Sequence, residues 1–227
     1  MLLCYITDRN QFPGDSSSQR AQLLNKIAEA ARYGVDFIQL REKDLSGHDL
    51  ESLAHEVVRT VRENSRGTTD NPELKTLLLI NSRMDVAIAC GADGVHLTAK
   101  DVSAGEARLA WELSPGVAKT SHPVITVSCH AEEDVSRAER EGADFVVFAP
   151  VFEKRNAPGV AAAGIQSLHR ACQHLIPVIA FGRNHDRERT AMYRRSRQWD
   201  RGNSSLPKQR HRDRGARPAR GVTECSC

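Results

Sequence analysis

The sequence has few aromatic residues and no apolar run that could cross a membrane. Aromatic residues make up 5% of the 227 residues and hydrophobic residues 40%, so a core must be built mainly from Ala, Val, Ile and Leu. No segment approaches the roughly 18 apolar residues of a membrane span. The apolar start 1–6 meets Asp8 and Arg9 without a basic leader, and we expect neither a signal peptide nor a membrane anchor.

Closely spaced cysteine pairs of the Cys-x-x-Cys or zinc-binding type are also missing. The six cysteines are scattered, and four of them lie within apolar segments. This usage is typical of reduced, buried thiols in a cytoplasmic protein.

The net charge of +3 is unevenly distributed. Residues 183–227 contain 12 Arg and one Lys against five acidic residues, a net charge of +8, so residues 1–182 carry −5. Residues 1–182 and residues 183–227 therefore differ in the sign of their net charge. We expect a folded domain over 1–182 and a basic, disordered tail over 183–227.

Within 1–182, short apolar runs alternate with amphipathic segments. Runs that are apolar throughout are typical of strands buried on both faces, and their alternation with helices predicts a parallel α/β sheet. The expected strands are Leu2–Thr7, Phe37–Leu40, Thr76–Asn81, Gly94–Leu97, Val124–Ser128, Phe145–Val151 and Pro177–Gly182. The expected helices are Arg20–Tyr33, Asp49–Glu63, Met84–Cys90, Ala104–Leu113, Glu132–Glu141 and Ile165–Leu175.

A repeated pattern favours a barrel over a doubly wound sheet. Residues 34–40, 91–97 and 142–148 each read as a glycine that ends a helix, a two-residue turn and a buried strand. No glycine-rich dinucleotide motif follows the first strand. Seven strands are one fewer than a TIM (β/α)₈ barrel requires, so we predict an incomplete TIM-type barrel of about seven βα units.

Polar residues follow most of the expected strands, at the end where barrels carry their chemistry. The segments are Gln39–Asp44, Asn81–Arg83, His96 with Asp101, Ser128–His130 and 152–155. Arg41 and Lys43 are two residues apart on an extended segment, so they point the same way and can bind a diphosphate together. A carboxylate across the mouth can hold Mg²⁺ against those phosphates. Alternatively, residues 41–44 form a solvated charge cluster.

Three motifs together resemble the thiamine phosphate synthase family and its relative, thiazole tautomerase. They are Gln39-Leu40-Arg41-Glu42-Lys43, Gly91-Ala92-Asp93-Gly94-Val95-His96-Leu97, and Gly142-Ala143-Asp144 through Ala149-Pro150-Val151-Phe152. The similarity runs from Tyr5-Ile6-Thr7-Asp8 to Gly182, about four-fifths of the chain.

The resemblance implies a transferase that joins an aminopyrimidine-methyl diphosphate to a thiazole phosphate and releases pyrophosphate. Both substrates are small molecules, and the cofactor is Mg²⁺. No side-chain nucleophile is required, and no convincing Ser/His/Asp arrangement is present. The implied diphosphate ligands are Gln39, Arg41, Lys43 and Asn81, with His96 and Ser128 at the pyrimidine, Asp101 at the metal, and Gly182 at the thiazole phosphate.

The chain departs from the family pattern at two binding positions. Ser82 stands where the family usually has a second, aspartate ligand to magnesium, and is a weaker metal ligand. Ala157 stands where the family has a lysine in the loop after the sixth strand, and Lys154 or Arg155 would replace it. These departures leave the tautomerase as an alternative, with His130 as a proton shuttle.

After Gly182 the family pattern stops, and a shift of reading frame restores it. Gly182-Arg183-Asn184-His185, read one nucleotide over, can encode Gly-Gly-Ile-Thr, as the family has. We therefore expect residues 183–227 to be out of frame, and the chain as written to be marginally stable and to lack synthase activity. An arginine-rich tail that binds nucleic acid is the alternative, which the patternless composition disfavours. The sequence leaves the oligomeric state open, a homo-oligomer included.

Overall fold

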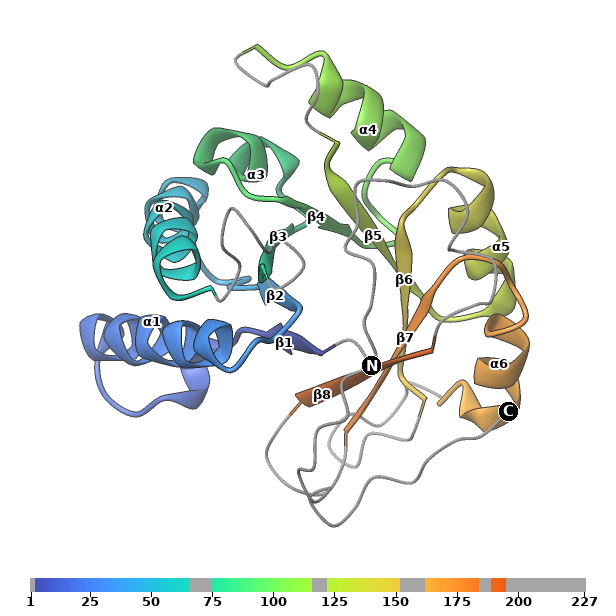
Figure 1. The fold of residues 1–227 in the computed structure, drawn as a ribbon, viewed down its shortest axis with the longest axis horizontal. Helices are drawn as coiled ribbons and strands as arrows, with labels where there is room; N and C mark the ends of the chain where they lie inside the picture. The colour runs from blue at the N-terminus through green and yellow to red at the C-terminus, as the bar shows by residue number, and fades with distance from the viewer. Residues whose placement is uncertain (1–2, 66–74, 116–121, 152–161, 184–188, 195–227) are drawn as a thin grey trace.

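The computed structural model describes residues 3–65, 75–115, 122–151, 162–183 and 189–194. Strands and helices alternate through the first seven strands (Figure 1). The strands are β1 (Cys4–Ile6), β2 (Phe37–Leu40), β3 (Leu77–Asn81), β4 (Gly94–Leu97), β5 (Val124–Cys129), β6 (Phe145–Phe148), β7 (Val178–Arg183) and β8 (Arg189–Arg194). The helices are α1 (Ser16–Arg32), α2 (Gly47–Asn64), α3 (Met84–Cys90), α4 (Ala104–Glu112), α5 (Glu132–Arg140) and α6 (Gly164–Ala171), with a short 3₁₀ turn, η1 (Arg9–Gln11).

The strands form a closed ring in the order β1 to β8. From β1 to β7 each strand lies parallel to the next, and helices cover the outside of the ring (Figure 1). The predicted TIM-type fold with seven parallel strands is therefore confirmed. Among the described helices, none has the length and apolar character needed to cross a membrane.

The eighth strand corrects the expectation of a disordered tail that begins at residue 183, because residues 183 and 189–194 lie in strands. β8 pairs antiparallel with β7 from Val178↔Arg194 to Arg183↔Arg189, and with β1 at one pair, Cys4↔Ala191. A parallel strand would need a crossover connection of roughly a dozen residues or more. Only residues 184–188 separate β7 from β8, so the chain can return only as a hairpin. Residues 195–227 lie outside the described part of the chain.

The repeated Gly-x-Asp pattern builds the amino-terminal end of the barrel. Gly34, Gly91 and Gly142 follow their helices with φ angles of 77°, 69° and 76°, a left-handed conformation that glycine adopts without strain. Two residues on, each repeat has an aspartate whose Oδ2 accepts a backbone hydrogen bond from the preceding strand. These bonds are Leu3 N to Asp36 at 2.7 Å, Leu78 N to Asp93 at 2.9 Å, and Ile125 N to Asp144 at 2.8 Å.

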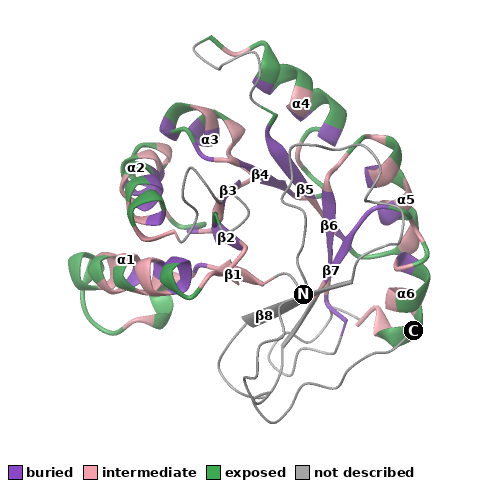
Figure 2. Ribbon diagram, in the orientation of Figure 1, coloured by how far each residue is buried: buried purple, intermediate pink, exposed green. Residues whose placement is uncertain are grey.

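Apolar side chains fill the lower part of the barrel interior. Phe37 and Phe145 meet edge to face with ring centroids 5.4 Å apart, and buried aliphatic side chains surround them. A second apolar layer lies between the strands and the helices, whose inner faces are buried (Figure 2). The carboxyl end of the interior is left to the polar residues that follow along the same strands.

Candidate active site

Five polar side chains form a tier inside the barrel, between the apolar layer and the carboxyl ends of the strands. They are Gln39 on β2, Asn81 on β3, His96 on β4, and Thr126 and Ser128 on β5. Because side chains alternate along a strand, Gln39, Asn81 and Thr126 point inward like Phe37, Leu79 and Val124 two residues earlier. Gln39 Nε2 donates to Asn81 Oδ1 at 2.9 Å. We call these five residues the polar tier.

His96 is the most constrained member of the polar tier. Its Nδ1 lies 2.8 Å from Thr126 Oγ1 and its Nε2 lies 2.9 Å from Ser128 Oγ. Burial and, to a smaller extent, the positive charge of Arg41 lower the pKa of His96 to about 4, against the opposing effect of the negative charge of Asp101. The imidazole is therefore neutral at neutral pH, with one ring nitrogen a donor and the other an acceptor. The charges of Arg41 and Asp101 therefore both act on the interior of the barrel at His96.

Asp101 and Ser82 carry the side-chain oxygens that the family resemblance implies as ligands of Mg²⁺. Asp101 Oδ2 accepts hydrogen bonds from Thr98 N at 2.6 Å and from Thr98 Oγ1 at 2.8 Å, which fixes the carboxylate after β4. Within the described ranges, no three His, Cys, Asp or Glu side chains gather as a metal-binding group. One carboxylate and a hydroxyl fit Mg²⁺ when substrate phosphates complete its coordination, which is how this ion is usually bound.

Ser82 is held against the polar tier in an unusual backbone conformation. Its φ of 60° is in the left-handed region, where Asn and Asp are more common than Ser. Its amide donates to His96 O at 2.8 Å, and its hydroxyl accepts from Asn81 Nδ2 at 3.1 Å. A hydrogen-bonded chain therefore runs from Gln39 through Asn81 to Ser82.

Arg41 and Lys43 follow the end of β2, and a buried acid, Glu42, lies between them in the sequence. Arg41 is half-buried, Lys43 is exposed, and Glu42 between them is 4% exposed. The burial of Glu42 argues against the alternative of a solvated charge cluster. The amide of Arg41 donates to Thr7 Oγ1 at 2.9 Å, so the end of β1 holds the start of this segment.

Three further predicted residues lie apart from the polar tier or outside the described residues. His130 is exposed at the end of β5, its Nδ1 bonded to the carbonyl of Ala149. Gly182 lies within β7, opposite Thr190 of β8, rather than in a loop. Lys154 is outside the described ranges.

Sequence reasoning missed Thr126, Thr98 and the partners of Glu42. Thr126 could have been found, because it lies two residues before Ser128 and so faces the same side of β5. Thr98 and the partners of Glu42 carried no comparable signal, since their roles depend on loops and on the pairing of β1 with β2.

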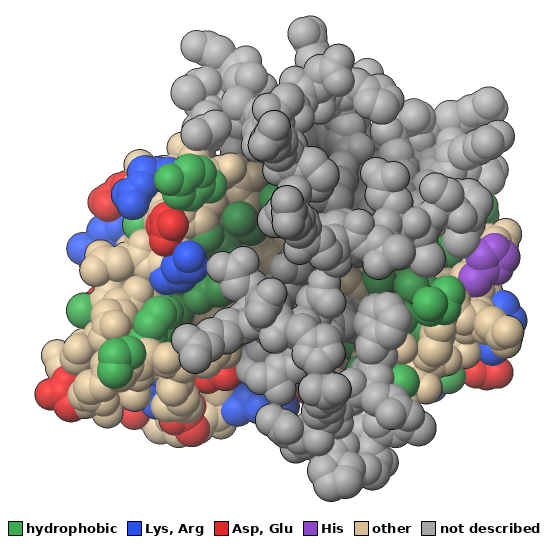
Figure 3. All heavy atoms as spheres, turned by 90° about the horizontal axis from the view of Figure 1, so that it is seen from below, with side chains coloured by type: hydrophobic (Ala, Val, Ile, Leu, Met, Phe, Trp, Pro, Cys, Tyr) green, Lys and Arg blue, Asp and Glu red, His purple; other side chains and the backbone are tan. Residues whose placement is uncertain are grey.

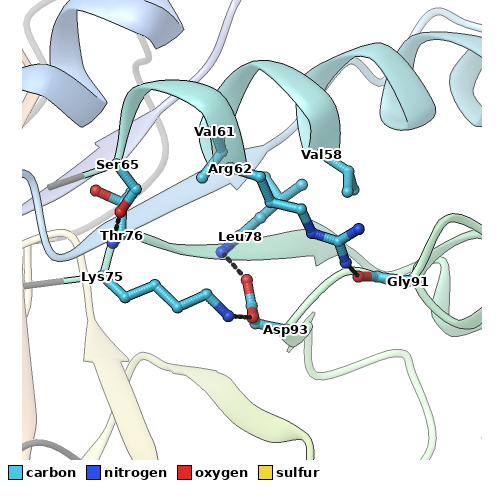
Figure 4. Close-up of a pocket in the computed structure, with 9 residues that line it drawn as sticks. All are labelled: Val58, Val61, Arg62, Ser65, Lys75, Thr76, Leu78, Gly91 and Asp93. Carbon is cyan, nitrogen blue, oxygen red and sulfur yellow. Dashed lines mark hydrogen bonds and ion pairs between the residues drawn. The ribbon is translucent and has the colours of Figure 1, made fainter. Parts of the chain in front are cut away.

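A pocket of about 110 Å³ lies at the opposite end of the barrel (Figure 4). Its charged groups pair with one another or with backbone: Lys75 Nζ lies 2.6 Å from Asp93 Oδ1, and Arg62 Nη2 donates to Gly91 O at 2.9 Å. Asp93 is also the repeat aspartate that bonds to β3. These contacts assign the pocket residues to the framework rather than to a ligand.

Figure 3 shows a face of the molecule on which the described acidic and basic side chains are intermingled around apolar ones. The visible described surface has no large area of a single charge. Electrostatic binding of a polyanion requires such an area, so the described part of this face offers no support for a nucleic-acid site.

The fold and the candidate site together indicate a class of protein. A parallel β/α barrel with polar groups collected at the carboxyl ends of its strands has the architecture of the barrel enzymes. A family model described as thiamine monophosphate synthase matches residues 3–193. The chain therefore belongs to the thiamine monophosphate synthase family, whose members are transferases, and the resemblance inferred from the motifs is confirmed.

Individual relatives agree with this assignment. A thiamine-phosphate synthase of Methanoculleus marisnigri is 38% identical over 184 residues, covering 79% of this chain and 75% of the relative. The thiamine-phosphate synthase of Chlorobium luteolum is 32% identical over 183 residues, covering 80% and 73%. Among solved structures, thiamine phosphate pyrophosphorylase from Pyrococcus furiosus has a TM-score of 0.60 and 25% identity, covering 80% of this chain and 74% of its own.

Proposed function

We propose that the barrel mouth joins an aminopyrimidine-methyl diphosphate to a thiazole phosphate, giving thiamine phosphate and pyrophosphate. The observation that carries this proposal is the polar tier, with the charges of Arg41 and Asp101 acting at His96. This arrangement offers cationic, amide and hydroxyl groups side by side, as a substrate with a diphosphate at one end and an aminopyrimidine at the other requires.

The diphosphate end is assigned to Arg41, Lys43, Gln39 and Asn81. Cationic and amide donors stabilise the charge that builds on pyrophosphate as its bond to the pyrimidine methylene breaks. Asp101 and Ser82 would hold Mg²⁺ there, and the bound ion would neutralise part of the charge on the leaving group.

The pyrimidine end is assigned to His96 and Ser128. Because His96 is neutral, its hydrogen bond fixes the Ser128 hydroxyl without placing a positive charge beside a developing pyrimidinylmethyl cation. The electron pair of the broken C–O bond leaves with pyrophosphate, and the thiazole nitrogen supplies the pair for the new C–N bond. The surrounding barrel limits capture of the cation by water.

The thiazole phosphate is assigned to Gly182, and Lys154 is assigned to the diphosphate, where it would replace the lysine that the family has in the loop after the sixth strand. The β7–β8 hairpin places Gly182 in a strand ladder instead of a phosphate-binding loop, so we expect weak binding of the thiazole phosphate. The tautomerase alternative depends on His130, and its bond to the Ala149 carbonyl, apart from the polar tier, does not favour a proton shuttle.

The cellular setting follows from the cysteines and the substrates. Cys4, Cys90, Cys129 and Cys172 are free thiols, and burial raises the pKa of Cys129 to about 12, which makes this thiol unreactive. We infer a cytoplasmic protein that acts on small molecules.

The proposed function is tested by pyrophosphate release. A version of the chain that follows the shifted reading frame after Gly182 is incubated with both substrates and Mg²⁺, and released pyrophosphate is measured with a coupled enzyme assay; a reaction without the thiazole phosphate is the control. Release that requires both substrates and is lost in Arg41→Ala supports the proposal. Isomerisation of a thiazole carboxylate, lost in His130→Ala and without pyrophosphate release, would support the tautomerase instead.

A further inference from the structure

A charge network, buried at Arg9 and Glu42, joins the end of β1 to the segment that carries Arg41 and Lys43. Thr7 Oγ1 donates to Glu42 Oε1 at 2.6 Å, and Glu42 Oε2 accepts from Arg9 N at 3.0 Å and Arg9 Nη1 at 3.2 Å. Arg9 also binds both carboxylate oxygens of Asp44, each at 2.7 Å. We call Thr7, Arg9, Glu42 and Asp44 the β1–β2 network.

The β1–β2 network holds the chain beyond the carboxyl end of β2, where the sheet ends. The ladder between β2 and β3 stops at Leu40↔Ile80, so this ladder does not fix the residues that follow. The amide of Arg41 is bound by Thr7 Oγ1 at 2.9 Å, and Glu42 and Asp44 are both bound by Arg9. The segment is therefore held at three points by residues more than thirty positions earlier in the chain.

Stability alone gives a weak reason for such a network. The side chain of Glu42 is 1% exposed and that of Arg9 is 11% exposed, and the cost of burying charges commonly equals or exceeds the gain from pairing them. A buried ion pair whose hydrogen bonds are all made holds its two side chains in a single geometry. The Arg9 hydrogen bonds hold the pKa of Asp44 below its ordinary value, so both ends of that pair remain charged.

We propose that Thr7, Arg9 and Glu42 are positioning residues of the diphosphate site: they fix the backbone that carries Arg41 and Lys43. This inference rests on the proposed function, because it assumes that these two cations bind the diphosphate. Glu42 separates them in sequence and is buried toward Thr7 and Arg9. A small displacement of such a binding group reduces affinity strongly.

The sign of one mutational effect separates positioning from simple electrostatics. The β1–β2 network carries one positive and two negative groups beside Arg41 and Lys43. If it acted only through its charge, Glu42→Gln would remove a repulsion and pyrophosphate would bind more tightly. If it positions the two cations, the same substitution breaks the hydrogen bonds from Arg9 and Thr7, and pyrophosphate binds more weakly.

The experiment measures the binding of inorganic pyrophosphate with Mg²⁺ to the full chain by isothermal titration calorimetry. We expect Glu42→Gln to weaken binding about tenfold and Thr7→Val about fivefold. Thr7→Ser keeps the hydroxyl and should stay within about twofold of the parent. Where turnover is measurable, the KM for the pyrimidine diphosphate should rise while the KM for the thiazole phosphate stays unchanged.

Asp144→Asn is the matched control, because Asp144 is also a mostly buried acid that bonds to an arginine and to a backbone amide. It accepts from Arg108 Nη2 at 2.9 Å and from Ile125 N at 2.8 Å, at the amino-terminal end of the barrel. This variant should melt at a lower temperature and bind pyrophosphate like the parent. A merely structural role for Glu42 would give the same pattern.

The outcomes distinguish this inference from the proposed function. A parent chain that does not bind pyrophosphate overturns the proposed function and the positioning role with it. A parent that binds, with Glu42→Gln and Thr7→Val binding equally well or more tightly, overturns the positioning role alone. If Glu42→Gln does not fold, the comparison of Thr7→Val with Thr7→Ser decides, since these substitutions differ at the hydroxyl and leave both charged pairs in place.

Discussion

The seam between β1 and β8 should be the weakest part of the barrel. β8 pairs with β1 at a single position, Cys4↔Ala191, whereas β1 pairs with β2 at three, Cys4↔Phe37 to Ile6↔Gln39. We predict that a version in which the chain after Gly182 follows the shifted reading frame closes this seam better, because the shifted text supplies the apolar pattern of a βα unit.

The expected gain follows from the missing pairs. Two further pairs at the seam correspond to two to four backbone hydrogen bonds, each worth about 1 kcal/mol net, so the unfolding free energy should rise by about 2–4 kcal/mol. For a chain of this size, such a change moves the melting temperature by roughly 4–16 °C.

Thermal melting followed by circular dichroism measures this gain, and pyrophosphate release measures its effect on activity. The chain as written should melt at the lower temperature and release no measurable pyrophosphate, because Gly182, assigned to the thiazole phosphate, lies in the β7–β8 ladder. Equal, cooperative melting of the two versions together with equal turnover would refute the frame-shift reasoning.

Three other predictions concern the barrel mouth. Arg41→Ala and Lys43→Ala, each in the frame-restored chain, should cost about 1.5–3 kcal/mol of pyrimidine diphosphate binding by calorimetry; unchanged affinity in both would disprove a shared diphosphate site. The pKa of His96 is about 4 in the folded protein against 6.5 ordinarily. The unfolded chain therefore takes up the proton first, and urea unfolding should show stability falling by up to about 3 kcal/mol between pH 6.5 and 4; a His96→Gln variant with the same pH dependence would contradict this. Ser82→Asp adds a second carboxylate to the proposed metal ligands and should lower the Mg²⁺ concentration for half-maximal pyrophosphate binding about tenfold, whereas no change would remove this position from the metal site.

Much of the fold could be predicted because it depends on local pattern. Apolar runs and helical periodicity indicated β1 to β7 and the helices between them, with bounds that shift by a few residues. The Gly-x-Asp repeat was visible as a turn signal, since a glycine that follows a helical pattern commonly ends the helix. The role of its aspartate could not be predicted from the sequence, because the amide to which it bonds belongs to the neighbouring strand segment.

Members of the polar tier could also be proposed from sequence. Gln39, Asn81, His96 and Ser128 all lie at or near strand ends, and parallel strands bring their carboxyl ends to one face. Which of them touch was not readable: the Gln39–Asn81 bond and the two bonds of His96 depend on the register between strands. The neutrality of His96 depends likewise on burial that only the closed interior provides.

The tertiary structure alone decided how the chain closes and how the cations of β2 are held. The direction of β8 follows from a connection too short for a crossover, and this matters only once β7 and β1 are near each other. The bonds of Glu42 join positions 33 to 35 residues apart. No local pattern encodes these bonds, because they exist only when β1 lies beside β2. The sequence by itself determined the helices, the strands and the residues at the strand ends. The packing of the strands determined which of those residues contact one another.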